Sequence, residues 1–177
     1  SEKVGKGLAL WLPKGFEIRQ ALQDEMMKIQ KEEGYKYVVT PHLAKTDLYK
    51  TSGHYEKYSE SSFSEFSTPD QDETFMLKPM NCPHHSEIYK AFPKSYKELP
   101  LRLAENGNVS RYEPSGTLHG MSRVRCFCQD DAHIFCTQEQ LGAEIGGVIN
   151  LVRKVFKRLG FEKYKAQISV RDYSDLS

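Results

Sequence analysis

Chemically versatile side chains alternate through the segment Arg123–His133. In an extended strand every second residue shares a face, and one such face would carry Arg123, Arg125, Phe127, Gln129, Asp131 and His133. Guanidiniums bind phosphate through paired hydrogen bonds, an aromatic ring stacks on a nucleobase, and a carboxylate with an amide can hold an amine or hydroxyl. The set suits a nucleotide with a small zwitterion, although alternation alone favours a solvated face with cross-strand ion pairs.

Histidines and cysteines form the second group of residues that could do chemistry. They are Cys82, His84, His85, His119, Cys126, Cys128, His133 and Cys136. No spacing matches a common zinc motif. Cys126, Cys128, His133 and Cys136 offer enough ligands for zinc, but on a straight strand Cys126 and Cys128 point away from His133. Small buried cysteines are the simpler interpretation.

The elements that position these residues begin with an amphipathic helix over Phe16–Glu33, which ends at Gly34. A β-branched strand over 37–40 follows and is closed by Pro41, which cannot donate to a ladder. The polar segment 56–73 predicts an exposed loop. The remaining expected elements are a strand over Phe75–Leu77, a helix over Ser86–Phe92, a hairpin within Leu101–Thr137 with a long tip, a helix over Gln138–Leu159 and a strand over Ala166–Val170. The sequence therefore predicts an α+β fold.

Length and composition bound the class of protein. The 177 residues carry 25 Lys and Arg against 24 Asp and Glu, a formal charge of +1, and 38% are hydrophobic. These values predict one globular domain over residues 1–177 and no basic nucleic-acid tail. The early apolar run Leu8–Leu12 is far shorter than the roughly 20 residues of a membrane span. No membrane segment is therefore expected. The chain is large enough to need no disulfides and three of its four cysteines lie within eleven residues, which indicates a reduced, cytoplasmic protein.

Three segments carry a family resemblance, namely LKPMNCP, RYEPSGTLHG and RVRCFCQDDAHIFC. Together with GLALWLPKG, VVTPHLAKTDLYKTSGHYEKY and YKAQISVRD, they closely resemble the catalytic core of threonyl-tRNA synthetases, which are class II aminoacyl-tRNA synthetases. The resemblance implies an antiparallel sheet flanked by helices. Residues 8–42 resemble motif 1, which implies a homodimer interface, and residues 102–136 resemble motif 2.

The resemblance implies an ATP site on motif 2. It assigns the α-phosphate to Arg111, the adenine side to Glu113 and the tail of ATP to Arg123, and Phe127 would stack on adenine. Arg111 and Gln129 are the residues it makes catalytic. The implied reaction is attack of the threonine carboxylate on the α-phosphate, with pyrophosphate leaving. Positioning and magnesium bound with ATP would supply the rate enhancement.

The resemblance also implies a threonine site with zinc. Gln129 and Asp131 would hold the amine and hydroxyl of L-threonine, with Met80 nearby. Cys82 and His133 match two of three family zinc ligands. Zinc bound to both amine and hydroxyl would reject valine, because valine lacks the hydroxyl; serine keeps both groups.

Several departures from the family pattern shape the expected activity. The chain stops at Ser177, before the third zinc ligand, motif 3 and the anticodon-binding domain. We therefore expect part of a synthetase that by itself binds ligands weakly and shows little or no aminoacylation. The intact enzyme would act on tRNA(Thr). The alternative is a non-catalytic paralogue or fragment that acts through the motif 1 dimer surface. Motif 2 also departs from the family pattern at Asn106, Ser110, Cys126 and Cys128.

Overall fold

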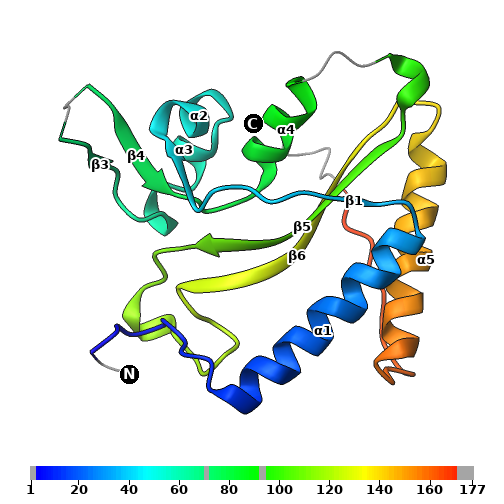
Figure 1. The fold of residues 1–177 in the computed structure, drawn as a ribbon, viewed down its shortest axis with the longest axis horizontal. Helices are drawn as coiled ribbons and strands as arrows, with labels where there is room; N and C mark the ends of the chain where they lie inside the picture. The colour runs from blue at the N-terminus through cyan, green and yellow to red at the C-terminus, as the bar shows by residue number, and fades with distance from the viewer. Residues whose placement is uncertain (1–2, 70–71, 92–94, 171–177) are drawn as a thin grey trace.

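A computed structural model describes residues 3–69, 72–91 and 95–170. That part of the chain holds two three-stranded sheets. The first sheet has the order β1 (Lys36–Tyr37), β5 (Leu101–Ser110), β6 (Cys126–Phe135). The second has the order β2 (Leu43–Lys45), β4 (Thr74–Leu77), β3 (Phe66–Ser67). Figure 1 shows the long β5–β6 hairpin crossing the middle of the molecule.

The β5–β6 hairpin is antiparallel and its register is unbroken. Pairing runs from Leu101 opposite Phe135 to Ser110 opposite Cys126. β1 extends the sheet by pairing parallel to β5, with Lys36 opposite Leu103. Because no bulge interrupts β6, side chains two residues apart stay on one face.

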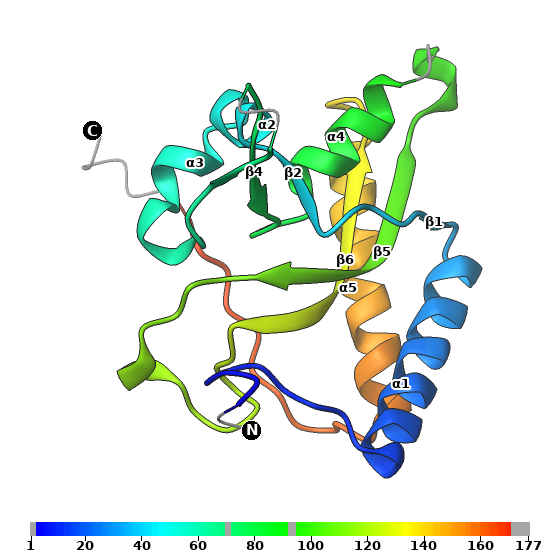
Figure 2. The same cartoon turned by 60° about the vertical axis from the view of Figure 1, so that its left-hand side comes forward.

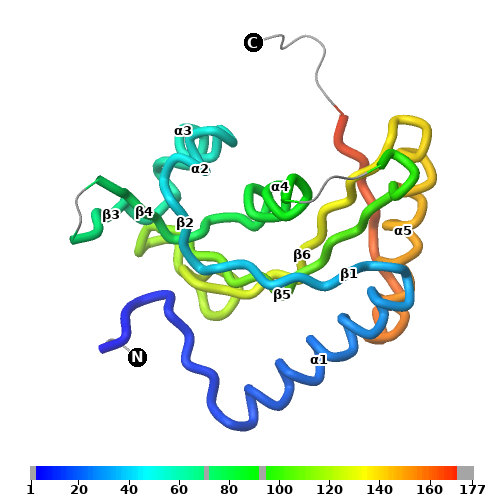
Figure 3. Tube along the Cα trace, turned by 45° about the horizontal axis from the view of Figure 1, so that its top comes forward, coloured from blue at the N-terminus to red at the C-terminus, as the bar shows by residue number. Residues whose placement is uncertain are grey.

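Three longer helices surround the hairpin, and their bounds are α1 (Pro13–Glu32), α4 (Cys82–Lys90) and α5 (Leu141–Arg158). Figure 3 shows α4 and α1 on opposite sides of the β5–β6 hairpin. Pro13 suits the first turn of α1 because its fixed φ matches a helix and its missing N–H is unused there. α1 and α5 lie side by side (Figures 1 and 2), joined by the ion pairs Lys154–Glu32 at 2.9 Å and Arg158–Glu25 at 2.6 Å.

Short elements complete the fold around the second sheet. Helices α2 (Thr46–Thr51) and α3 (His54–Lys57) lie beside β2 and β4 in Figure 2. Single 3-10 turns occupy Ser59–Ser61, Tyr96–Glu98 and Ser115–Thr117. No helix in the three described stretches is long and apolar enough to cross a bilayer.

Polar side chains share the interior with apolar ones. Tyr49, Met76, Ala104 and Val109 are buried, as expected of a core. Lys78, Asn81, Glu105 and His85 are also at most 3% exposed. Charged and amide groups are rarely buried without partners, so this interior must contain a polar network.

The main predicted elements are confirmed, with shifted ends. The first helix begins at Pro13 instead of Phe16, and the last covers Leu141–Arg158 instead of Gln138–Leu159. The short helix begins at Cys82 instead of Ser86, because the Asn81 carbonyl already accepts a hydrogen bond from the His85 amide at 3.1 Å. Its predicted end at Phe92 lies outside the described residues.

Three predictions were wrong in detail. The segment 56–73 is not only a loop, because β3 pairs with β4 there and the rings of Phe66 and Phe75 stack 6.4 Å apart. The strand expected over 37–40 is shorter, since the Thr40 amide donates to the Glu105 carboxylate instead of a backbone carbonyl. Ala166–Val170 is not a strand: Ile168 is 87% exposed, and no described segment pairs with it.

Candidate active site

One face of the hairpin gathers the residues that the sequence marks for ligand binding. Phe127, Gln129, Asp131 and His133 occupy alternate positions of β6 on the side of α4. Opposite them on β5 stand Val109, Gly107, Glu105 and Leu103, respectively. His133 lies six positions after Phe127 along the strand, a span of about 20 Å. This face is long enough for a nucleotide and an amino acid laid end to end.

The outer end of the face carries the guanidiniums. Arg111 lies over the Phe127 ring, 5.2 Å from its centroid, and its Nε donates to the Pro79 carbonyl at 3.3 Å. Arg123 and Glu113 form an ion pair at 3.0 Å, in which the Arg123 side chain is 59% exposed. Both pairs leave cationic nitrogen at the hairpin tip, where phosphate oxygens could be bound.

Two arginines of the predicted alternation lie outside the strand. β6 begins at Cys126, so Arg123 and Arg125 do not continue the face of Phe127 as a regular strand would. The Arg125 amide instead donates to the Gly7 carbonyl at 2.7 Å, and its guanidinium turns back to the Glu113 carbonyl at 2.9 Å. Arg125 therefore organises the hairpin tip.

In the middle of the face, the absence of a side chain at one residue makes room for the side chain of Asn81. Gly107 stands opposite Gln129, and a Cβ on Gly107 would meet the Asn81 amide at 2.4 Å. Asn81 uses that space to donate from Nδ2 to Asp131 Oδ2 at 2.9 Å. Half-buried Met80 lies between Pro79, which contacts Arg111, and Asn81, which contacts Asp131. The turn after β4 is thereby held against the hairpin.

The inner end of the face holds Cys82 and His133. Cys82 is the first residue of α4, and burial and the Asp131 charge raise the pKa of its thiol. His133 Nδ1 lies 2.9 Å from His85 Nδ1, with the rings nearly perpendicular. Burial lowers the pKa of His133, against the opposing effect of Asp131.

These two donors fit zinc in kind but not in number. Thiolate and imidazole are ligand types that zinc prefers. The charge of Asp131 acts to raise the pKa of both Cys82 and His133. Catalytic zinc sites use about three protein ligands. Within residues 3–69, 72–91 and 95–170 no group of three or more His, Cys, Asp or Glu side chains is placed to hold a metal ion. Cys82 and His133 could therefore supply only part of a zinc site.

The structure adds a polar network that the sequence analysis missed. Glu105 accepts hydrogen bonds from the Thr40 amide at 2.8 Å and from His85 Nε2 at 3.0 Å. Lys78 donates to Thr40 Oγ1 at 2.7 Å and lies 3.6 Å from the same carboxylate. The sequence did carry one sign of this network. Glu105 is a charged residue that shares a face of the strand with the apolar residues Leu103 and Val109, and a buried carboxylate requires buried partners.

The other face of the hairpin turns toward α1. Gln23 donates to Cys128 Sγ at 3.2 Å, and Gln30 donates to Asp130 at 2.7 Å. Cys126 and Cys128 therefore lie on the opposite face from His133, which rules out the four-ligand zinc cluster. A pocket of about 900 Å³ lies on this side, and its lining includes all four departures from the family pattern, Asn106, Ser110, Cys126 and Cys128.

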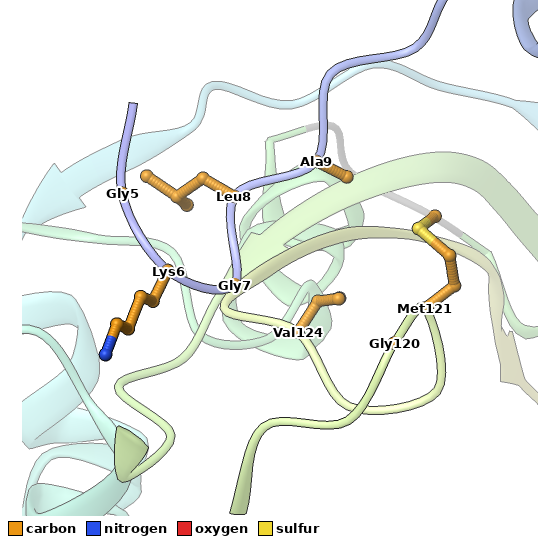
Figure 4. A pocket seen from close by; sticks show the side chains of 8 residues that line it. All are labelled: Gly5, Lys6, Gly7, Leu8, Ala9, Gly120, Met121 and Val124. Atoms are coloured by element: carbon orange, nitrogen blue, oxygen red, sulfur yellow. The ribbon is translucent and has the colours of Figure 1, made fainter. Parts of the chain in front are cut away.

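A smaller pocket of about 260 Å³ lies where the N-terminal segment meets the hairpin tip. Figure 4 shows Gly5–Ala9 passing over the loop that holds Gly120, Met121 and Val124, with the Lys6 side chain extending away from Met121 and Val124. None of the residues assigned to ATP, threonine or zinc lines it. The N-terminal segment forms one wall of this pocket and also contacts Arg125 through Gly7.

The antiparallel hairpin, with arginines at its tip, polar groups along one face and helices beside it, agrees with the fold that the resemblance to class II aminoacyl-tRNA synthetases implies. Residues 63–175 match the tRNA synthetase class II core domain family (G, H, P, S and T). The threonine–tRNA ligase of Flavobacterium psychrophilum is 60% identical over 172 residues, covering 97% of this chain and 26% of the relative. The threonine–tRNA ligase of Azobacteroides pseudotrichonymphae is 58% identical over 175 residues, which cover 99% of this chain and 27% of the relative.

A solved structure agrees with these sequence matches. The RNA binding domain of threonyl-tRNA synthetase from Cryptosporidium parvum superimposes with a TM-score of 0.85 at 40% identity, covering 90% of this chain and 39% of that one. The chain belongs to the class II tRNA synthetase core family, and the relatives named here are threonine–tRNA ligases and a threonyl-tRNA synthetase domain. It spans about a quarter of the length of these curated relatives.

Proposed function

We propose that this chain is the ATP- and threonine-binding part of a threonine–tRNA ligase, which forms threonyl-adenylate and then threonyl-tRNA. The observation that carries the proposal is the single hairpin face from Arg111 and Phe127 to Asp131 and His133. One end of this face carries a guanidinium and an aromatic ring, which suit the phosphates and base of ATP. The other end carries polar side chains, which suit the amine and hydroxyl of an amino acid.

The outer end is assigned to ATP. Arg111 binds the α-phosphate as the principal catalytic residue, since a guanidinium there stabilises the charge that develops during attack. Phe127 stacks on adenine, Glu113 contacts the adenine side and Arg123 binds the tail. Glu113 and Arg123 now pair with each other, so ATP must exchange this ion pair for its own contacts. Magnesium bound with ATP would offset the remaining phosphate charge.

The inner end is assigned to L-threonine. Gln129 and Asp131 hold the amine and hydroxyl, with Met80 beside them, so that the carboxylate points toward the α-phosphate. A carboxylate oxygen then bonds to the α-phosphorus while the bond to pyrophosphate breaks, and Gln129 keeps the two reactants aligned. Cys82 and His133 would supply two of the ligands of a zinc ion, and such an ion would recognise the amine and hydroxyl of threonine. We place the reaction in the cytoplasm, with tRNA(Thr) as acceptor of the threonyl group.

Binding of a threonyl-adenylate analogue tests the proposal directly. We expect calorimetry to detect binding of the sulfamoyl analogue to this chain, and Arg111→Ala to weaken it about 10- to 100-fold, because a charge-assisted contact is lost. Arg153 is an exposed residue of α5, so the Arg153→Ala variant should bind the analogue as tightly as the original chain does. A folded chain without analogue binding, or equal losses in both variants, would contradict the proposal.

Exchange of pyrophosphate into ATP then tests the chemistry. Exchange that depends on threonine and not on valine would support adenylate formation by this part of the synthetase. Analogue binding without exchange would favour the second candidate, a non-catalytic partner acting through its dimer surface. That candidate is supported by the row of exposed apolar residues on and before α1, namely Leu10, Trp11, Leu12, Phe16, Ile18 and Leu22.

A further inference from the structure

One buried amide side chain lies against the middle of the hairpin face. Asn81 stands directly before α4 and is fully buried. Its backbone carbonyl accepts a hydrogen bond from the His85 amide at 3.1 Å, so the first turn of the helix holds its backbone. Its side chain packs against Gly107 of β5, where a Cβ would come within 2.4 Å of both Oδ1 and Nδ2. The Asn81 side chain is therefore closely confined.

The orientation of this amide matches Asp131. Asn81 Nδ2 donates to Asp131 Oδ2 at 2.9 Å. A carboxylate oxygen accepts hydrogen bonds, so the NH2 group of the amide has to face Asp131. The Oδ1 atom of the same amide is buried and receives no hydrogen bond from residues 3–69, 72–91 and 95–170. A buried acceptor without a donor is destabilising, so the amide is oriented for the carboxylate and not for its own oxygen.

The contact leaves Asp131 with one held oxygen and one available oxygen. Asn81 is the one hydrogen-bond donor that the described part of the chain supplies to this carboxylate. Asp131 is half-buried on the α4 side of β6, opposite Glu105. With Oδ2 occupied, Oδ1 remains as an acceptor on the face assigned to ligands. A side chain that is already held in one orientation loses less conformational freedom when a ligand binds.

We propose that Asn81 is a positioning residue that holds Asp131 so that its Oδ1 accepts the hydroxyl of the bound amino acid, and that the site thereby selects threonine over valine. The inference rests on the proposed function in assigning Asp131 to the amino acid. Threonine donates its hydroxyl hydrogen to Oδ1, whereas valine leaves that oxygen desolvated and unpaired, which weakens binding. Valine is penalised only if Asp131 cannot turn away, and the hydrogen bond from Asn81 opposes that turn.

A second amide–carboxylate pair on the opposite face of β6 provides a matched control. Gln30 is 4% exposed, and its Nε2 donates to Asp130 Oδ1 at 2.7 Å. Asp130 faces α1 because neighbouring residues of a strand point to opposite sides. Gln30→Met removes a buried amide donor from the adjacent aspartate of the same strand and leaves Asp131 in place. An effect that reflects only lost packing should therefore appear in both variants.

NMR of the chain without ligand tests the positioning role. Three-bond couplings about the Cα–Cβ bond of Asp131 should report a single rotamer in the original chain. Asn81→Leu keeps the size and branching of the side chain but removes the donor, so these couplings should average over several rotamers. Gln30→Met should retain the single rotamer. Averaged couplings in the original chain, or the same single rotamer in Asn81→Leu, would overturn the inference.

Calorimetric titration with the sulfamoyl analogues of threonyl-, seryl- and valyl-adenylate tests the specificity role. In Asn81→Leu we expect the threonine and serine analogues to bind about 10-fold more weakly and the valine analogue to bind as before. Serine should follow threonine because both carry the hydroxyl. Gln30→Met should keep the original preference for threonine over valine. Equal weakening of all three analogues in Asn81→Leu would indicate a structural role alone and would overturn the inference.

Gly107→Ala keeps the test decisive if Asn81→Leu does not fold. The new Cβ displaces the Asn81 amide, so the preference for threonine over valine should again fall about 10-fold although Asn81 itself is unchanged. An unchanged preference in Gly107→Ala would overturn the inference. A failure of the proposed function is recognised separately. If the original chain holds Asp131 in one rotamer through Asn81 but binds none of the three analogues, the positioning of Asp131 is supported and threonine binding at this face is contradicted.

Discussion

At the scale of single residues, Gly107 shows how one missing side chain shapes the site. A Cβ at this position would lie 2.4 Å from the Asn81 amide, which is buried and bonded to Asp131. We expect Gly107→Ala to lower the free energy of unfolding by about 1–3 kcal/mol, because a buried group must move. It should also break the Asn81–Asp131 hydrogen bond. Urea unfolding monitored by circular dichroism measures the first effect.

Two companion variants identify the cause of that loss. Adding Asn81→Ala to Gly107→Ala removes the clash, so the pair should cost less than the sum of the single changes. Gly142→Ala in α5 meets no atom within 4 Å and should raise the free energy of unfolding by about 0.5–1 kcal/mol. If the two single changes were instead simply additive, the contact of Asn81 with position 107 would not be the reason.

Glu105 makes a prediction about acid stability. Its folded pKa of about 2 is below its ordinary value of 4.5, so its contribution is complete above pH 4.5 and is lost as the pH falls toward 2. The contribution of the Glu105 charge to the free energy of unfolding is on the order of 3 kcal/mol. The difference in unfolding free energy between the original chain and Glu105→Gln should therefore shrink over that range. Urea titrations at several pH values measure it, and a constant difference would contradict the assigned pKa.

The arrangement of the site was only partly predictable from the residues. Strict alternation from Phe127 to His133 was enough to place those four side chains on one face, because the strand carries no bulge. The network around Glu105 was not predictable. Its members come from four separate segments, and no local pattern indicates which buried donor meets which acceptor.

At the scale of elements, one ion pair ties the hairpin to α5. Arg102 and Glu144 are joined by two hydrogen bonds of 2.6 Å, and the Glu144 side chain is only 9% exposed. Paired contacts of this geometry are among the stronger ion pairs. Glu144→Gln should lower the free energy of unfolding by about 1–3 kcal/mol, because it weakens one partner of a largely buried pair.

A second ion pair provides the matched control for this change. Glu25 pairs with Arg158 between α1 and α5 at 2.6 Å, but the Arg158 side chain is 64% exposed. Exposed pairs contribute about 0–1 kcal/mol, so Glu25→Gln should have a small effect. Thermal unfolding of both variants under one buffer compares them. Equal losses would mean that burial does not distinguish the two pairs.

The elements were predictable where periodicity or end signals are strong. The helices over 13–32 and 141–158 follow from their apolar spacing and from Gly34 and Gly160. Short strands were less predictable because a strand exists only where a partner is present. Phe66 lies in a strand because β4 pairs with it. Residues 166–170 have no partner strand within the described chain.

At the scale of the whole molecule, the β5–β6 hairpin serves two purposes through its two faces. The α4 side holds the proposed ligand site, and the α1 side holds Cys128, Asp130 and the large pocket. The residues are interleaved on the same strand, so a one-residue slip in register would exchange the faces. The ten-residue pairing of β5 with β6 fixes that register. Ligand binding and the α1 surface therefore depend on the same backbone.

The exposed apolar residues of α1 lead to a prediction about assembly. Ile18 is 65% and Leu22 46% exposed, and both line the pocket on the α1 side. We expect the chain to form a dimer through this surface, because contiguous apolar surface is stabilised by burial. Ile18→Glu with Leu22→Glu should weaken the dimer at least about 10-fold, since an unpaired charge would be buried in the interface. Sedimentation equilibrium over a range of concentrations measures the dissociation constant.

The control for this prediction is a substitution to glutamate outside the motif 1 segment 8–42. Ile168 is 87% exposed on the segment after α5, so Ile168→Glu should leave dimerisation unchanged while adding one of the same charges. A strictly monomeric original chain would remove the dimer surface from the proposal, and with it the support for a non-catalytic partner role. Loss of the dimer in the α1 variant, with analogue binding retained, would show that the two faces of the hairpin can be separated.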